Sequence, residues 1–352
     1  MQSSQLSQKH QNRLLRMLLV LGLIASASLV FPMIAVASTI RINLGTLAPH
    51  GTHYHHSMLK MGEKWREASE GLIRLVVYPG GTQGGEADMV RLMQIGTLNA
   101  AMLSVTGLSD IVPEVTGLQN MPLAFRSLDE VDYVNDKLGP KLGKLFEQKG
   151  FVVLFWGNGG WVRYFSKESM FTPKDLKKMK MFVWAGDPAH VDILRHAGYY
   201  PVPLEPADLI TSIKTPMVDA APLYPIWALS AQIYLTAKHM LELNWAPLVG
   251  AVVIKTDTWN RIPAPLREKL LKIAGEVGRE INDNSRKELL EAVEAMKRRG
   301  LIVHAVSPEL ESEWRTEVEK FYPEIRGRIV PADIFDETLD LLNEYRSKNR
   351  IK

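Results

Sequence analysis

The sequence contains no cysteine at any of its 352 positions. This absence excludes a disulfide framework, a cysteine nucleophile, thiolate metal sites and lipidation at a cysteine. An excess of charge is missing too, because 42 Lys and Arg face 39 Asp and Glu, and Lys9, Arg13 and Arg16 lie in the first 16 residues. The rest of the chain is balanced at 39 against 39. We therefore predict no binding of nucleic acid or of an acidic membrane surface.

Catalytic and nucleotide-binding motifs are also lacking. No serine stands in a G-x-S-x-G elbow and no H-E-x-x-H segment occurs. The glycines of GGTQGG, residues 80–85, are not followed by Gly-Lys-Ser/Thr and do not have dinucleotide-binding spacing. Glu86, Asp187 and Asp219 follow predicted strand ends, but nothing in the sequence shows that these carboxylates converge. We predict a protein that is not an enzyme and has no cofactor.

Residues 1–37 have the three-part layout of a secretory signal peptide. A basic start precedes the apolar stretch Met17–Phe31, and Ala35-Val36-Ala37 forms an A-x-A site. We expect cleavage after Ala37 and a periplasmic protein. An uncleaved anchor is the alternative, since residues 17–36 approach the ~20 needed to span a bilayer. A sensory ectodomain would need a second such segment, and none follows residue 39.

Helix and strand patterns alternate along the remaining chain. Thr172-Pro173 and Asp187-Pro188 are predicted helix starts on either side of a short apolar strand, Met181–Trp184. Such alternation predicts an α/β fold with a mainly parallel sheet covered on both faces. Residues 226–243 are predicted to be helical. Residues 265–299 predict a helix of about 35 residues, which at ~1.5 Å per residue could reach ~50 Å.

An internal similarity indicates two lobes. Residues 93–103 can be laid over 213–223 at a constant offset of 120, and both segments pass from a helix end through a short turn to Ala-Ala. About 315 residues beyond the signal also exceed the usual single hydrophobic core. The physical interpretation is two lobes built alike, each presenting strand ends to a shared cleft that closes by hinge motion.

Three segments together resemble a known family. They are YPGGTQGGEADMVRLMQIGTLNAAM (78–102), TPKDLKKMKMFVW (172–184) and LEPADLITSIKTPMVDAAPLYP (204–225). With NMPLAF (120–125) and the run from 243 to 270, they are similar to the solute-binding proteins of TRAP transporters, of the DctP type. The resemblance implies a two-lobe periplasmic solute-binding fold with a long helix spanning both lobes. It also implies delivery of a small solute to membrane permease subunits, with an accessory periplasmic protein as a further candidate partner.

The predicted layout follows from this resemblance. A signal peptide (1–37) precedes lobe I (39–156, with 249–285 returning to it). Lobe II comprises 157–248, with 286–330 packed on it, and 331–352 form a C-terminal helical segment.

Aromatic side chains and a missing arginine predict the kind of solute. Trp161, Trp184, Tyr224, Trp227 and Trp245 fall at or just beyond predicted strand ends, where aromatic area suits an apolar pocket. Trp227 is as readily explained as a core residue. These positions favour an apolar or aromatic solute.

The resembled family mostly holds a ligand carboxylate with the arginine of a K-x-R motif, which here reads Lys180-Met181-Phe182. Arg163 fits a second family arginine only with a one-residue shift, which on a strand would turn its side chain to the other face. These two departures from the family's arginine pattern agree with an apolar solute. An organic acid held by Arg163 is the alternative.

Histidines provide the remaining candidates. His50, His53, His55 and His56 form a cluster after the first strand, and a metal held by His50, His53 and His56 is a less favoured alternative to a polar loop facing the ligand. We expect no metal site. Thr46, His53 and Glu86 are expected from lobe I, and Trp161, Phe182 and Trp184 from lobe II. The predicted ligand-binding residues are Thr46, His53, Glu86, Trp161, Arg163, Phe182, Trp184, Tyr224 and Trp245.

Overall fold

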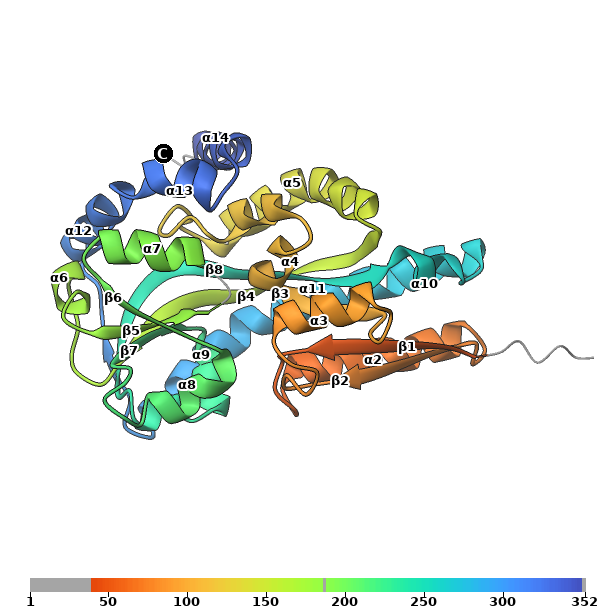
Figure 1. Ribbon diagram of the computed structural model, residues 1–352, viewed down its shortest axis with the longest axis horizontal. Helices are drawn as coiled ribbons and strands as arrows, with labels where there is room; N and C mark the ends of the chain where they lie inside the picture. Colours follow the sequence, from red (N-terminus) through yellow and green to blue (C-terminus); the bar gives the residue numbers. More distant parts are fainter. Residues whose placement is uncertain (1–38, 186–187, 350–352) are drawn as a thin grey trace, which may run out of the picture. The chain divides into compact units, whose positions relative to one another are not determined.

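The structure, a computed structural model, describes residues 39–185 and 188–349. The predicted signal peptide and the predicted helix cap Asp187 therefore lie outside the described residues. The described chain forms one nine-stranded sheet with the order β2-β1-β3-β8-β4-β7-β5-β6, in which β9 pairs with β8 (Figure 1). The strands are β1 (Ile40–Thr46), β2 (Ile73–Tyr78), β3 (Ala100–Ser104), β4 (Phe151–Ser166), β5 (Lys180–Trp184), β6 (Tyr200–Leu204), β7 (Ala220–Leu223), β8 (His239–Lys255) and β9 (Ile302–His304).

The two long strands β4 and β8 join the halves of the sheet. They pair antiparallel from Phe151 opposite Lys255 to Ser166 opposite His239. β8 is also antiparallel to β3, and β4 to β7. The pairs β1–β2, β1–β3, β5–β6 and β5–β7 are parallel, as expected for helix-linked strands. Each half is thus a parallel unit, and antiparallel strands join the two halves.

Helices cover both faces of each half, as the α/β prediction required. In the first half, α2 and the start of α11 lie on one face, and α3, α4 and α5 on the other. In the second half, α7 and α12 share a core on one face, while α8, α9 and the end of α11 share a core on the other. The helices are α2 (His53–Ala68), α3 (Glu86–Gln94), α4 (Val105–Ser109), α5 (Leu128–Gln148), α6 (Pro173–Leu176), α7 (Pro188–His196), α8 (Pro206–Ser212), α9 (Pro225–Ser230), α10 (Thr256–Asn260), α11 (Ala264–Lys297), α12 (Pro308–Glu319), α13 (Tyr322–Arg328) and α14 (Ala332–Lys348), with 3-10 turns η1 (Pro113–Leu118) and η2 (Ile233–Leu235).

The predicted helix over residues 226–243 is wrong. α9 ends at Ser230, Gln232 takes the left-handed conformation with φ 56°, and β8 begins at His239. The apolar residues of this segment follow a pattern that suits either state. Pairing with β4, which lies some 75 residues earlier in the chain, decides for the strand. Helix α5 continues through Pro140.

Helix α11 spans both halves, as predicted. Its 34 residues pack against α2 in the first half and α9 in the second. The contact with β4 is close at Gly278, where an added Cβ would lie 2.6 Å from Cδ2 of Phe155. Gly275, one turn earlier, has only Arg279 Nη1 near it, at 3.8 Å from such a Cβ. The glycine at 278 therefore allows helix and sheet to approach, whereas the one at 275 does not serve this contact.

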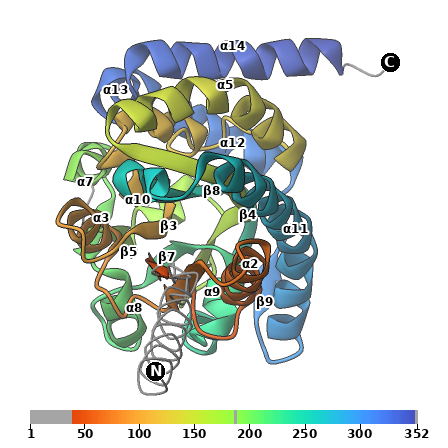
Figure 2. The ribbon, with the colours of Figure 1, turned by 90° about the vertical axis from the view of Figure 1, so that its right-hand side faces the viewer.

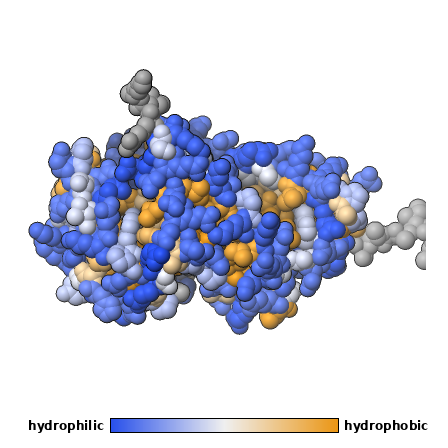
Figure 3. Space-filling view, turned by 90° about the horizontal axis from the view of Figure 1, so that it is seen from above, coloured by the Kyte–Doolittle hydropathy of each residue, from blue (hydrophilic) through white to orange (hydrophobic). Residues whose placement is uncertain are grey.

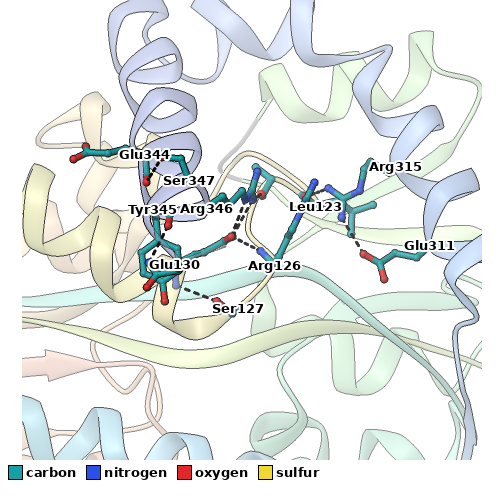
Figure 4. A network of polar contacts seen from close by, with 12 residues as sticks. Leu123, Arg126, Ser127, Glu130, Glu311, Arg315, Glu344, Tyr345, Arg346 and Ser347 are labelled. Carbon is teal, nitrogen blue, oxygen red and sulfur yellow. Dashed lines mark hydrogen bonds and ion pairs between the residues drawn. The ribbon is translucent and has the colours of Figure 1, made fainter. Parts of the chain in front are cut away.

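Polar contacts attach the C-terminal helices to the first half (Figure 4). Arg346 of α14 forms a bidentate pair with Glu130 of α5, at 2.7 Å for Nε–Oε1 and 2.9 Å for Nη2–Oε2, and it donates to the Ala124 carbonyl at 2.6 Å. Glu130 is only 3% exposed, so this pair is largely removed from water. Arg315 of α12 donates to the carbonyl of Leu123. Figure 2 shows α14 lying along α5.

On the face seen in Figure 3, hydrophilic residues predominate and hydrophobic residues appear in patches among them. None of the helices within residues 39–185 and 188–349 is both long enough and apolar enough to cross a membrane.

Candidate functional site

A cavity of about 930 Å³ lies where strands of the two halves end. Thr46 and Ser104 reach it from the ends of β1 and β3, and Trp184 and Leu223 from the ends of β5 and β7. The long strands β4 and β8 supply further wall, through residues such as Gly157 and Gly250. In open α/β sheets, ligands bind outside the carboxyl ends of parallel strands. The position of the cavity therefore makes it the candidate ligand site.

The internal sequence similarity has a structural counterpart. Residues Ala100–Leu103 lie in β3, residues Ala220–Leu223 form β7, and each strand follows a short helix, α3 or α8. Both strands run into the cavity, since Leu103 and Leu223 line it. The repeated segment thus supplies one cavity wall from each half.

Six of the nine predicted ligand residues line the cavity. Phe182 is 4% exposed and Thr46 1% exposed, so both are buried walls, and Thr46 Oγ1 accepts the Ala48 amide at 3.0 Å. The six are Thr46, Glu86, Phe182, Trp184, Tyr224 and Trp245.

The other three, His53, Trp161 and Arg163, do not belong to the cavity wall. His53 contacts Ser285 and Glu288 of α11, and burial lowers the pKa of this histidine to about 4. Trp161 packs into the core that α5 covers.

The geometry of β4 explains the position of Arg163. Side chains alternate between the faces of a strand, and Val162 and Tyr164 are the ones that line the cavity. Arg163 is 7% exposed and contacts Glu242 Oε1 and Asn244 Oδ1, both at 3.3 Å. A register irregularity lies between Asn158 and Trp161 in the pairing with β8. A second irregularity lies between Val162 and Tyr164, on either side of Arg163, and these two neighbours are the residues that line the cavity.

Four lining aromatics, Tyr54, Phe155, Tyr164 and Trp227, were missing from the predicted set. Tyr54 is adjacent to His53, and its hydroxyl contacts Ser285 Oγ at 2.9 Å. Tyr164 lies two residues after Val162 and therefore on the same face of β4. The strand period would have predicted Tyr164 if Val162 had been known to face the cavity. Trp227, which the sequence explains equally well as a core residue, lines the cavity and also packs against the core shared by α8, α9 and the end of α11.

Aromatic rings pack in two groups along the wall. Tyr164 and Trp245 meet edge to face, with centroids 5.1 Å apart, and Trp314 packs behind both. Tyr224 stacks with Trp227 at 6.1 Å and an interplanar angle of 25°. Such packed rings hold one another in place and present a rigid apolar surface to a ligand.

The charged wall residues are acidic in the described part of the chain. Glu86, Asp88, Glu205 and Asp208 line the cavity, and none of its described lining residues is Lys or Arg. Glu86 is the buried one, at 8% exposure. Burial raises the pKa of the Glu86 carboxyl, and hydrogen bonds from Ser104 and Gly107 oppose that shift. A ligand carboxylate entering this cavity would meet no Lys or Arg on the described wall, where His190 is the basic side chain.

The histidine cluster does not form a metal site in the structure. His55 lies 4.7 Å from His50 and 5.6 Å from His56, measured between ring centroids. Within the described residues, no three His, Asp or Glu side chains are placed to hold a metal ion. His53 points instead toward α11.

Comparisons with known proteins agree with this architecture. An uncharacterized protein of Haemophilus influenzae is 25% identical over 75% of this chain and 80% of its own length. The 2,3-diketo-L-gulonate-binding periplasmic protein YiaO of Escherichia coli is 25% identical over 71% of this chain and 76% of its own. The C4-dicarboxylate-binding periplasmic protein DctP of Rhodobacter capsulatus is 22% identical over 88% of this chain and 94% of its own length.

Solved structures share the fold. A TRAP periplasmic solute-binding protein from Ralstonia eutropha with bound (S)-2-acetolactate has a TM-score of 0.80 at 19% identity, covering 87% of this chain and 99% of that one. One from Pseudomonas putida with bound D-glucuronate has a TM-score of 0.75 at 23% identity, covering 85% and 96%. Residues 44–327 match DctP, the bacterial extracellular solute-binding protein family 7. This chain therefore belongs to the DctP family of solute-binding proteins, the substrate-binding components of TRAP transporters.

Proposed function

We propose that the protein binds a small apolar or aromatic solute that lacks a carboxylate and delivers it to the membrane subunits of its TRAP transporter. The observation that carries this proposal is the composition of the cavity wall. Phe182 stands where the resembled family mostly has arginine, Val162 lines the cavity whereas Arg163 does not, and no described wall residue is Lys or Arg. A carboxylate desolvated in such a cavity would remain unpaired, which costs several kcal/mol.

The cavity wall comes from both halves of the protein, so one solute can contact both halves when they close. Thr46 and Glu86 come from the first half, and Phe182 and Tyr224 from the second. A solute that touches both sets at once only in the closed form shifts the population toward closure. The closed, loaded protein is then the form that the membrane subunits recognise. The lobe boundaries predicted at 156/157 and 248/249 fall within β4 and β8, which would make those strands the hinge.

An organic acid is the second candidate, because several proteins of the same fold carry bound acids such as D-glucuronate and L-galactonate. For this chain the acid would need Arg163, whose contacts are with Glu242 and Asn244 on the other face of β4. A change in β4 would have to precede such binding. The apolar solute requires no rearrangement of this kind.

The proposal further includes a periplasmic location after removal of residues 1–37, and no catalysis. The intact mass of the protein from a periplasmic extract tests the cleavage. We expect the mass of a chain whose first residue is Ser38. An accessory periplasmic partner remains a prediction from the resemblance. Co-purification from the native host would test it.

Native mass spectrometry of the mature protein as purified, followed by denaturing extraction, is the decisive experiment on the solute. We expect an apolar or aromatic compound without a carboxylate, retained at about one per chain. An organic acid in that place would contradict the proposal and direct attention to Arg163. Retained metal would instead return the histidine cluster to consideration.

A further inference from the structure

Glu86 is a buried carboxylate whose hydrogen bonds all come from neutral groups. Oε1 accepts the Ser104 amide at 2.7 Å, and Oε2 accepts the Ser104 hydroxyl at 2.6 Å and the Gly107 amide at 2.9 Å. These donors suit the ionised form, since a carboxylate can accept all of them. No Lys, Arg or His of the described residues forms an ion pair with it. Among residues 39–185 and 188–349 this charge therefore has no cationic partner, and a buried unpaired charge is costly.

Glu86 also accepts the backbone amides at the start of α4. The amides of Ser104 and Gly107 belong to the turn from β3 into α4, at the carboxyl end of a parallel strand. Amides at such a turn commonly bind anions in α/β proteins. Because Glu86 already accepts from them, they are not available to a solute carboxylate.

Aromatic side chains of the second half line the same cavity as this charge. Tyr224, at the start of α9, and Trp227 belong to the wall together with Glu86. Burial, with smaller contributions from Tyr54 and Glu86, raises the pKa of Tyr224. Trp227 stacks on the Tyr224 ring. Ring faces attract cations, and the attraction grows when water is excluded.

We propose that the solute carries a protonated amine or other organic cation on its apolar body, and that this cation binds between Glu86 and the Tyr224–Trp227 pair. The proposal rests on the proposed function and specifies its solute class. The cation would contact a carboxylate of the first half and ring faces of the second, so its binding favours closure. At the mouth, the exposed carboxylates Asp88, Glu205 and Asp208 give a field of the sign that attracts cations.

Matched probes test the inference on the native mature protein. Each series has one apolar body with three end groups: tryptamine, tryptophol and indole-3-acetate; phenethylamine, 2-phenylethanol and phenylacetate; hexylamine, hexanol and hexanoate. Titration calorimetry at pH 7 gives the dissociation constants. We expect at least one amine to bind about tenfold or more tightly than its alcohol, equivalent to about 1.4 kcal/mol, with the acid weakest in that series.

The outcomes separate the two proposals. If no amine binds more tightly than its alcohol, including the case in which none of the amines binds, the cation inference is overturned. The apolar-solute proposal is still supported by that result if an alcohol binds more tightly than the acid of the same series. Acids that bind most tightly would overturn both proposals.

Two variants locate the interaction. Glu86→Gln should reduce the amine-to-alcohol preference to near one while leaving the affinity for the alcohol within a few fold. Because Glu86 also accepts two backbone amides, this variant must show a native circular dichroism spectrum to count. Trp227→Leu removes an aromatic face and no charge, and it should lower the amine preference by about threefold or more. An unchanged preference in a folded Glu86→Gln variant, or in Trp227→Leu if the former does not fold, would refute the placement.

Discussion

Replacing Phe182 by arginine should convert the cavity into one that binds acids. The side chain lies on β5, is 4% exposed and lines the cavity, so a guanidinium placed there begins from the wall of the site. Hydrogen bonds to a charged group contribute about 1.5–3 kcal/mol. Phe182→Arg should therefore strengthen the binding of D-glucuronate by about ten- to a hundredfold.

The same change should lower the stability of the protein. Phe182 packs in a buried cluster with Phe165 and Leu223, and loss of a buried aromatic side chain removes about 1.5–3 kcal/mol of apolar burial. Urea denaturation without ligand measures this loss. Phe182→Leu is the matched control, because it also removes the ring but adds no charge. It should lose stability and gain no affinity for the acid.

Titration calorimetry with D-glucuronate and with (S)-2-acetolactate provides the affinities for the native protein and both variants. We expect the native protein to bind neither acid measurably at millimolar concentration. Micromolar binding of either acid by the native protein, together with no gain in Phe182→Arg, would refute the reasoning from the missing arginine.

Three further changes address the fold. Arg346→Met leaves the carboxylate of Glu130 buried and unpaired, and should lower the free energy of unfolding in urea by about 3 kcal/mol. Gly278→Ala should cost about 1–3 kcal/mol by crowding the sheet, whereas Gly275→Ala in the same helix should gain up to about 1 kcal/mol. Hydrogen bonds from two lysines lower the pKa of Glu317 below its ordinary 4.5 in the folded state, so this group stabilises the protein above that pH and its contribution is lost as pH falls. The Tm of Glu317→Gln should thus lie below that of the native protein at pH 7, with the difference shrinking toward pH 3.

Each of these changes has a control or an outcome that contradicts it. Arg326→Met breaks the exposed pair with Asp336 and should leave stability unchanged, so an equal loss in Arg346→Met and Arg326→Met would show that burial is not the cause. Equal effects at Gly278 and Gly275 would contradict the close contact between α11 and β4. A Tm difference for Glu317→Gln that is the same at pH 3 and pH 7 would exclude the linkage to the lysine contacts, one of which is Lys177 Nζ at 2.6 Å.

Much of the fold follows from local sequence signals. The capping box at Thr172 and Asp175 forms as the spacing predicts, although the helix it starts has only four residues. The helix predicted over residues 265–299 is α11, within two residues of its predicted limits. Trp184 could be placed at the site because residues at the carboxyl end of a buried parallel strand lie at one edge of the sheet. Phe182 could be placed there because it stands at the arginine position of the family's K-x-R motif.

Sequence patterns alone thus predict the α/β class, the two similar halves, the family resemblance and six of the lining residues. These depend on short-range periodicity and on motifs that are complete within a few residues. Only the tertiary structure decided that residues 239–255 form a strand and that Val162, with Tyr164, faces the cavity while Trp161 and Arg163 do not. The physical reason is that the pairing of β4 with β8, irregularity included, joins residues far apart in the chain, and a shift of one residue in a strand moves every side chain to the opposite face.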